Sequence, residues 1–488
     1  MKILPGFFAM TIVFFIFIGC VETSPAKGAD TAPGRALFIP PLLQPDSKNE
    51  AGTHYTINVQ SGESEFIPGS MTKTIGYNGN FLGPTIRMAA GETVSFAVHN
   101  SLAEKTTLHW HGMRLPSEMD GGPLPMHVID AGKTWLPHFT VKQQAATLWY
   151  HPHFAGTTAE QVYRGLAGIV IIEDEASAAL SLPKKYGIND IPLIVQERRF
   201  LKDGTFSYSP AQPDIMHGYY GNALLTNGMI KPVFTVKESL TRFRLLNGSN
   251  SSVLRFYFED QTEFYQIASD GGFLRKPVKR QELVLSPGER AEILVDILKE
   301  EVRGNNKNLI ADVYSGNKYT ALVIDTGEMK ISRSSIPKTL VSLFPPKQSK
   351  NMNTRRFVLS TMSMGMGVSG TLTINNKKMD MNRVDEYIPV NTPEVWEIVN
   401  DTRGMGMMNI PHSFHIHDTQ FLVLAVNGEP PPGQLAGYKD TILLWPGDAF
   451  RILVQFDEYL GKYMYHCHLL EHEDQGMMGI FEVIASGK

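Results

Sequence analysis

Ten of the fifteen histidines in this 488-residue chain fall in four short segments. The segments read HWH (109–111), HPH (151–153), HSFHIH (412–417) and HCHLLEH (466–472). Each contains a His-x-His pair, and residues i and i+2 of a β-strand project from the same face. Each pair can therefore present two imidazoles to one site, and four such pairs are not expected by chance at this histidine content. The spacing predicts a large metal site built from histidine.

A second ligand set remains when the four pairs are set aside. It consists of His412, Cys467, His472 and Met477. On a strand, Cys467 points away from both of its histidine neighbours, so its thiol is expected to serve a different centre while staying covalently joined to theirs. Two imidazoles, a thiolate and a thioether are the ligands of a blue copper electron-transfer site. Zinc is the alternative, but structural zinc sites favour compact four-ligand sets with more cysteine.

The N-terminus predicts export from the cytoplasm. MKILPGFFAMTIVFFIFIGC contains one lysine and then a nearly unbroken apolar run, which is typical of a signal peptide. We predict a leader over residues 1–28. Cleavage before Cys20 would leave a lipoprotein anchored through that residue, whereas cleavage after Ala26 or Gly28 would release the protein. A retained membrane anchor is the third alternative, and all three predict a secreted, periplasmic or membrane-anchored protein.

The composition is that of a soluble globular protein with several cores. Hydrophobic residues make up 42% and charged residues 19%, and the net charge of -4 with no long basic run argues against nucleic acid as a partner. Cys20 and Cys467 are the only cysteines, so the folded body has no intrachain disulfide framework. We expect a monomer.

Three copies of one pattern follow the leader, beginning at Tyr77, Leu225 and Leu372. Each runs through a turn, a short strand, a second turn and an alternating strand that ends in asparagine. Long amphipathic helices are not expected, and turn residues recur at short intervals. We therefore predict an all-β fold of three Greek-key sandwiches. The predicted units are 38–180, 190–333 and 357–488, with a linker over 334–356. The middle unit has one histidine, His217, and is expected to be structural.

Taken together, the chain resembles the three-domain multicopper oxidases, the family of laccases, bilirubin oxidases and bacterial copper efflux oxidases. The resemblance covers essentially the whole chain after the leader. It rests on HWHG, WYHPH, HSFHIH and HCHLLEHEDQGMM, which occur in the family's order. It implies three cupredoxin-like domains, with the first and third facing each other across a trinuclear copper cluster.

The resemblance also implies a role for each ligand. The type 1 copper would be held by His412, Cys467, His472 and an axial Met477. The type 2 copper would be held by His109 and His415. The two type 3 coppers would be held by His111, His151 and His468, and by His153, His417 and His466. Asp120 would supply protons near the type 2 copper, and Glu473 near the type 3 pair. Two positions depart from the family: Ser413 stands where proline is usual, and Asp418 where glycine is usual.

The activity implied is one-electron oxidation of a donor at the type 1 copper, coupled to four-electron reduction of dioxygen to water. Our leading interpretation is a laccase-like enzyme acting on phenolic or aromatic substrates. A cuprous oxidase that protects against copper is the close alternative, because Met405, Met407 and Met408 precede His412. Thioethers suit Cu(I), but they also fill apolar cores. The long methionine-rich insertion of copper efflux oxidases is missing.

Two further alternatives stay open, and a third is disfavoured. Bilirubin oxidase-like activity fits the same motifs. A copper-binding or storage protein without turnover would also fit, although such a protein has no need of the complete ligand set. Nitrite reductases carry two cupredoxin domains, whereas three repeats are visible here.

Overall fold

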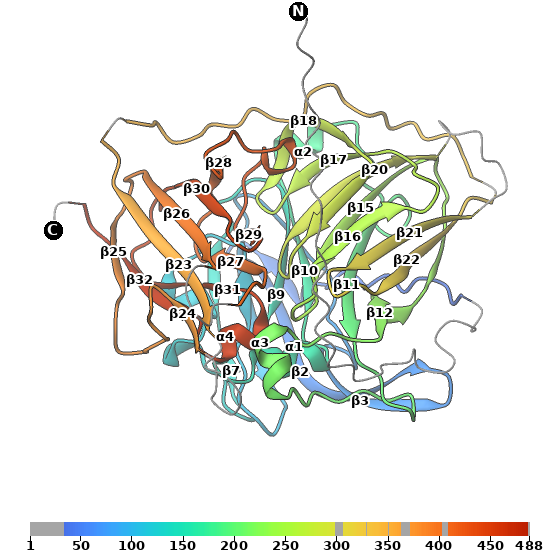
Figure 1. Cartoon of the computed structure of the whole chain (residues 1–488). Helices are drawn as coiled ribbons and strands as arrows, with labels where there is room; N and C mark the ends of the chain where they lie inside the picture. Colours follow the sequence, from blue (N-terminus) through green and yellow to red (C-terminus); the bar gives the residue numbers. More distant parts are fainter. Residues whose placement is uncertain are drawn as a thin grey trace, which may run out of the picture.

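The computed structural model describes residues 34–297, 306–327, 329–349, 351–362, 371–402 and 408–486. Over these ranges the chain forms six sheets, and these belong in sequence order to three successive pairs. Figure 1 shows the three pairs as separate blocks that meet at the centre of the molecule. The all-β prediction is confirmed.

The first pair of sheets is formed by residues 47–173. In one sheet β1-β2-β5-β7 are neighbours, while β3 pairs with β2 and β8 with β5; the other has the order β4-β10-β9-β6. The strands are β1 (Ser47–Asn49), β2 (Gly52–Ile67), β3 (Ser70–Tyr77), β4 (Ile86–Ala89), β5 (Thr93–Asn100), β6 (His109–His111), β7 (Thr134–Trp135), β8 (His138–Thr140), β9 (Ala146–His151) and β10 (Gly168–Glu173). Phe96 on one sheet and Trp110 on the other share one buried core, which makes this pair a sandwich.

The second pair is formed by residues 190–325. Its sheets have the orders β13-β12-β11-β15-β20-β17-β18 and β14-β22-β21-β16-β19. The strands are β11 (Asp190–Arg198), β12 (Ala223–Thr226), β13 (Met229–Ile230), β14 (Val233–Thr235), β15 (Leu240–Asn247), β16 (Leu254–Phe258), β17 (Phe264–Ser269), β18 (Gly272–Arg280), β19 (Glu282–Leu285), β20 (Arg290–Asp296), β21 (Lys307–Val313) and β22 (Lys318–Asp325). Phe243 and Phe256 from opposite sheets lie in its core.

The third pair is formed by residues 354–484. Its sheets have the orders β24-β23-β26-β30-β28 and β25-β32-β31-β27-β29. The strands are β23 (Thr354–Met362), β24 (Thr371–Ile374), β25 (Glu386–Pro389), β26 (Glu394–Asp401), β27 (His412–Ile416), β28 (Leu422–Val426), β29 (Thr441–Leu444), β30 (Ala449–Val454), β31 (Gly461–Cys467) and β32 (Met478–Ile484). β23 begins inside the segment expected to be a linker. The predicted domain boundaries stay predictions.

The helices are short. They are α1 (Thr158–Arg164), α2 (Glu175–Ala179), α3 (Gln212–His217) and α4 (Leu470–Asp474), with 3₁₀ turns η1 (Ser117–Met119), η2 (Pro125–His127) and η4 (Gly433–Leu435). α4 contacts both α1 and α3, so helices from all three parts of the chain meet at one place (Figure 1). Within the described ranges, no helix combines the length and the apolar character needed to cross a bilayer.

The repeated asparagine has the same task in all three sandwiches. β5 alternates between buried and more exposed positions, as its sequence predicts, and it ends at the fully buried Asn100. The side-chain amide of Asn100 donates to two loop carbonyls, whereas those of Asn247 and Asn400 each donate to one loop carbonyl and to the carbonyl at the end of another strand. Each asparagine therefore satisfies one carbonyl of the loop that follows its strand and one carbonyl farther along the chain. In the first and third sandwiches, these loops lead to the histidine motifs.

Candidate functional site

Strand pairing brings the histidine motifs together. His109 on β6 lies opposite His151 on β9, and His415 on β27 lies opposite His466 on β31. The two strand pairs meet through stacked rings, His109 on His417 and His111 on His415, and the ten motif histidines are all buried. The alternation of the strands separates the ligands as expected, because Cys467 enters the core of the third sandwich.

One group of three histidines converges through its Nε2 atoms. The Nε2 atom of His466 lies 3.2 Å from Nε2 of His153 and 3.2 Å from Nε2 of His417. Their Nδ1 atoms face oxygen instead: that of His417 lies 2.9 Å from Asp120 Oδ2, and those of His153 and His466 lie 3.2 and 3.1 Å from the Glu473 carboxylate. A ring that donates one N–H to a carboxylate keeps the other nitrogen free for a metal.

A second group combines His111, His151 and His468. Nδ1 of His111 lies 3.4 Å from Nε2 of His151, and the opposite nitrogens face oxygen: His111 Nε2 is 3.1 Å from Asp440 Oδ1, and His151 Nδ1 is 2.8 Å from the carbonyl of Pro152. Neither ring nitrogen of His468 has a hydrogen-bond partner among the described residues, although the ring is fully buried. Buried polar atoms without partners are costly, so this arrangement fits a metal at their meeting point.

His109 and His415 form the third group. Their Nδ1 atoms lie 2.8 and 2.9 Å from the backbone carbonyls of Asp120 and Asp440. Both Nε2 atoms are buried and have no hydrogen-bond partner in the part of the chain that the structure describes. Two fixed tautomers with free Nε2 lone pairs are suited to hold one metal ion between them.

The fourth group contains the cysteine. Cys467 Sγ lies 3.4 Å from His412 Nδ1 and 3.6 Å from His472 Nδ1, and Met477 is fully buried in the same core. Burial raises the pKa of the Cys467 thiol to about 12. A thiolate at this place therefore requires a bound cation, and a soft sulfur and imidazole set suits copper.

The Nε2 atoms of His412 and His472 contact different parts of the chain. His412 Nε2 lies 3.2 Å from the hydroxyl of Thr361 on β23. His472 Nε2 lies 3.3 Å from the backbone carbonyl of Met216 on α3, a helix of the middle part of the chain. Both rings are thus fixed with Nδ1 toward the sulfur.

Burial favours the neutral form of His109, His111, His415 and His472. Burial, followed by the nearby His417 ring, lowers the pKa of His109 to about 3. Burial lowers the pKa of His472 to about 4, and it lowers the pKa of His111 and His415 well below the usual histidine range. Neutral imidazole is the form that binds metal, so these residues are ready as ligands at neutral pH.

Known proteins match this arrangement along nearly the whole chain. Residues 58–177 and 344–486 match sequence models of the family described as "Multicopper oxidase". "Multicopper oxidase mco" of Staphylococcus haemolyticus is 40% identical over 447 residues, which are 92% of each chain. The chain belongs to the multicopper oxidase family. Copper cofactors, dioxygen and a reducing substrate follow from that membership.

Other relatives carry different descriptions. A crystal structure of a laccase from Pediococcus acidilactici is 35% identical, covers 93% of this chain and 94% of its own, and superposes with a TM-score of 0.85. The "Cell division protein FtsP" of Photorhabdus laumondii is 34% identical over 91% of each chain. The cupredoxin-like fold is confirmed, and the family membership does not by itself choose a substrate.

The two predicted proton-relay carboxylates of this multicopper oxidase lie at the histidine groups. Glu473 on α4 is fully buried and contacts two histidines of one group. Asp120 Oδ2 contacts His417, while its Oδ1 lies 3.6 Å from Nδ1 of His109. Each carboxylate therefore lies behind metal-binding rings and not in a surface turn.

Both departures from the family's usual residues have structural partners. The Ser413 hydroxyl lies 2.8 Å from the Ser286 hydroxyl and donates to the carbonyl of Pro287. Asp418 adopts a left-handed φ of 61°, a conformation that glycine takes most easily, and its carboxylate accepts from the amide of Leu115. Burial and the neighbouring Asp120 raise the pKa of Asp418 well above the usual aspartate range.

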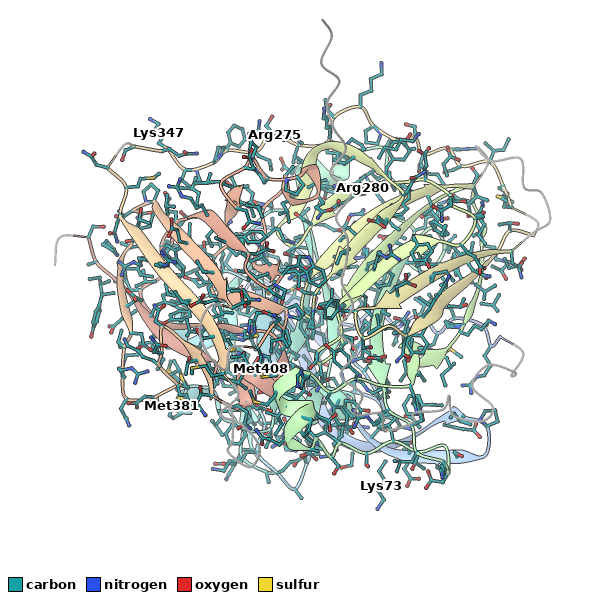
Figure 2. All side chains as sticks on the ribbon, viewed as in Figure 1. Lys73, Arg275, Arg280, Lys347, Met381 and Met408 are labelled. Atoms are coloured by element: carbon teal, nitrogen blue, oxygen red, sulfur yellow. The ribbon has the colours of Figure 1, made fainter. Side chains whose placement is uncertain are left out.

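The methionines proposed for Cu(I) are only partly described. Met405 and Met407 lie outside the described residues. Met408 is half-buried against the core of the third sandwich, and its amide donates to the carbonyl of Thr361, the residue whose hydroxyl contacts His412 (Figure 2). Met408 is therefore a packing residue that lies close to the cysteine group.

Several residues that support the site had no sequence signal. Asp440 contacts two ligand histidines, the Thr361 hydroxyl contacts His412, and the Met216 carbonyl contacts His472. None of these three supporting residues belongs to a histidine motif. Their roles depend on contacts between segments that are far apart in the sequence, and local sequence patterns do not predict such contacts.

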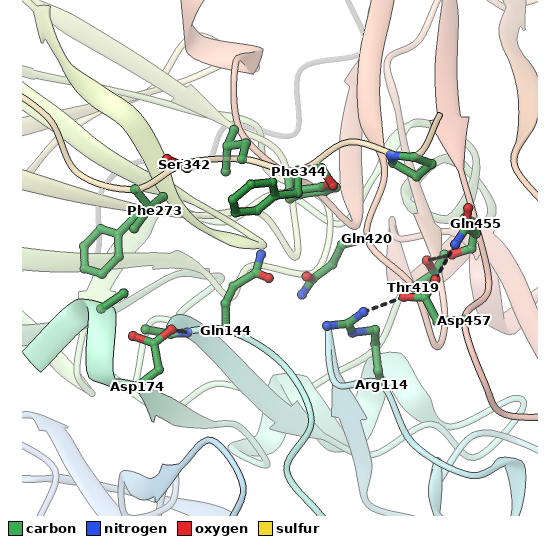
Figure 3. Close-up of a pocket in the computed structure, with 16 residues that line it drawn as sticks. Arg114, Gln144, Asp174, Phe273, Ser342, Phe344, Thr419, Gln420, Gln455 and Asp457 are labelled. Carbon is green, nitrogen blue, oxygen red and sulfur yellow. Dashed lines mark hydrogen bonds and ion pairs between the residues drawn. The ribbon is translucent and has the colours of Figure 1, made fainter. Parts of the chain in front are cut away.

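A cavity of about 410 Å³ lies beside, not at, the histidine groups. Its wall includes Arg114, Gln420 and Tyr438, and Figure 3 shows Arg114 joined to Asp457 across it, with 2.8 Å between Nη1 and Oδ2. The lining contains none of the predicted copper ligands. We assign this cavity no role in the reaction.

Proposed function

We propose that this multicopper oxidase is a laccase-type enzyme that removes single electrons from phenolic or aromatic donors and reduces dioxygen to water. The observation that carries the proposal is the set of buried, unpartnered histidine nitrogens that converge beside the cysteine group. We propose four copper ions: one type 1, one type 2 and two type 3. When bound, copper supplies the one-electron acceptor at Cys467 and the redox centre that reduces dioxygen.

The chain itself supplies the link between the two centres. Cys467 lies between His466 and His468 in sequence, so the sulfur ligand of one centre is covalently joined to ligands of the other. The rings of His466 near the end of β31 and of His468 just after it lie near each other, while the sulfur enters the core of the third sandwich. This connection allows electrons to pass through bonds without movement of the backbone.

Protons reach the site through the chain's carboxylates in this proposal. Reduction of dioxygen to water consumes as many protons as electrons, and the histidine groups are sealed from solvent. The carboxylates in this path are Glu473, beside the Nδ1 atoms of His153 and His466, and Asp120, beside Nδ1 of His417.

Glu473→Gln is expected to lower kcat by roughly 10²- to 10⁴-fold, the range for loss of a proton-transfer group. The amide keeps the size of the side chain, so the visible absorption of the type 1 site should not change, and the rate is expressed per bound copper. Oxygen uptake with a methoxyphenol measures the loss, and Glu458→Gln, at a surface ion pair with Lys142, is the matched control. A rate within about two-fold of wild type would remove Glu473 from the relay.

The similar laccase structure supports a phenolic donor, and one observation supports Cu(I) instead. Met408 lies beside Thr361, the residue that covers His412, and a thioether there is suited to Cu(I). We propose the phenol as the preferred donor, because Met408 packs into the core of the third sandwich.

The donor is tested by oxygen uptake of the copper-loaded enzyme with Cu(I) and with a methoxyphenol under matched conditions. We expect faster uptake with the phenol, and no selective loss with Cu(I) in Met408→Leu or in the triple variant of Met405, Met407 and Met408 to leucine. Faster uptake with Cu(I), lost in the triple variant, would establish a cuprous oxidase. Faster oxygen uptake with bilirubin than with Cu(I) or the phenol would favour bilirubin oxidase-like activity.

We further propose that the protein acts outside the cytoplasm, because its N-terminal sequence is typical of a signal peptide. We also propose that it is a monomer. The non-enzymatic alternative is a copper-binding protein. The complete set of twelve predicted ligands, ten histidines with Cys467 and Met477, supports an enzyme.

A further inference from the structure

The middle sandwich provides none of the predicted copper ligands, yet one of its turns lies against them. The turn Ser286–Arg290 connects β19 to β20. It is buried throughout, and it makes three separate interactions with the third sandwich, one of which extends through Asp440 to His111 of the first.

The first interaction is the contact of Gly288 with His468. Gly288 has a φ of +86°, and a Cβ atom built there would lie 3.1 Å from three atoms of the His468 ring. The glycine backbone thus lies directly on the imidazole. Since neither nitrogen of this ring has a hydrogen-bond partner among the described residues, its orientation depends on packing, against Gly288 on one side and against Trp149 and neighbouring histidine rings.

The second interaction involves Ser413, the residue that replaces the family's usual proline. Its hydroxyl lies 2.8 Å from the Ser286 hydroxyl and donates over 2.9 Å to the carbonyl of Pro287. The carbonyl of Ser413 accepts the amide hydrogen of His468. A proline at 413 has no hydroxyl to make these bonds, so this link between the turn and β27 depends on the serine.

The third interaction is a bidentate ion pair. The Arg290 guanidinium lies 2.7 and 2.6 Å from the two carboxylate oxygens of Asp440, and both side chains are fully buried. Asp440 Oδ1 then lies 3.1 Å from His111 Nε2, and its backbone carbonyl lies 2.9 Å from His415 Nδ1. The carboxylate determines which nitrogen of His111 carries the proton and leaves Nδ1 as the ligand.

We infer that the Ser286–Arg290 turn is a positioning element for the trinuclear copper site, with Arg290 orienting His111 and His415 through Asp440, and Gly288 and Ser413 orienting His468. The inference rests on the proposed four-copper function. The middle sandwich therefore contacts residues that hold the cluster, and its role is not limited to connecting the other two sandwiches. Without Arg290, the buried Asp440 carboxylate loses its main counter-charge and has no fixed position.

Arg290→Lys tests the inference, because it keeps the charge and removes the two-pronged geometry. We expect the type 1 visible absorption to persist, while the near-ultraviolet absorption of the coupled copper pair is lost. We also expect the cluster coppers to pass to a chelator at roughly 10- to 100-fold lower concentration, the usual effect of removing a partner of a ligand histidine. Arg242→Lys is the matched control, since Arg242 forms a buried pair with Glu292 in the same sandwich without contacting a ligand.

Two milder variants keep the test decisive if Arg290→Lys does not fold. Ser413→Ala removes the hydroxyl link, and Gly288→Ala pushes against His468; both should weaken the near-ultraviolet signal and leave the type 1 band intact. Wild-type spectra and chelator resistance in every folded variant would overturn the inference. A wild-type protein without a coupled copper pair would instead overturn the proposed function, so the two failures are distinguishable.

Discussion

Cys467→Ser is expected to abolish both the intense visible absorption and the oxidase activity, down to the background of copper in buffer, while the protein stays folded. Cys467 is the one thiol in the part of the chain that the structure describes, it lies beside His412 and His472, and serine nearly matches its volume in a fully buried site. A serine hydroxyl is a much harder donor and does not form the blue copper ligand set. Visible absorption, oxygen uptake and thermal unfolding of the same preparation measure the three parts of this expectation.

Met464→Leu is the matched control for this substitution. Met464 is buried on the same strand as Cys467, but it packs in a separate cluster with Met478 and Ile480. The leucine variant should keep its colour and its activity, because methionine and leucine are close in volume. A Cys467→Ser protein that remained blue and active would show that the type 1 assignment is wrong.

His111→Ala is expected to have an equally large effect on turnover and none on the colour. His111 contacts His151 and Asp440, whereas the cysteine group lies in the core of the third sandwich. The variant should stay blue, be bleached by one addition of donor, and fail to recover its colour when air is admitted. Stopped-flow absorption at the visible band separates these steps.

The control for His111→Ala is His138→Ala on β8, an exposed histidine outside the four groups. It should bleach and recover like wild type. Recovery of the His111→Ala colour at the normal rate would mean that the trinuclear cluster is placed at the wrong histidines.

The features that depend on the alternation of side chains along a β-strand could be predicted from the sequence. The alternation in β5 and the His-x-His spacing both follow from the two-residue repeat of a strand, and so does the separation of Cys467 from its neighbours. The three repeats were visible because each sandwich needs the same order of turns and alternating strands. The repeated asparagine is explained by the loop carbonyls that its amide satisfies.

Contacts made by docking were not predictable. Arg290 and Asp440 are separated by 150 residues, and no local pattern in either segment indicates that they meet. The same holds for the Met216 carbonyl, which covers His472 from the middle sandwich. The middle part was expected to be structural because it lacks paired histidines, but supporting residues need not be ligands, and their effect depends on tertiary geometry.

The number of donor electrons consumed per dioxygen tests the central claim most directly. The copper-loaded protein is mixed with a limiting amount of a one-electron phenolic donor, and oxygen loss and peroxide are followed together. If the histidine groups and the cysteine group act as one enzyme, four donor electrons disappear for each dioxygen and no peroxide accumulates. Two electrons per dioxygen with peroxide as the product would contradict the account, as would a fully copper-loaded protein that consumes no oxygen.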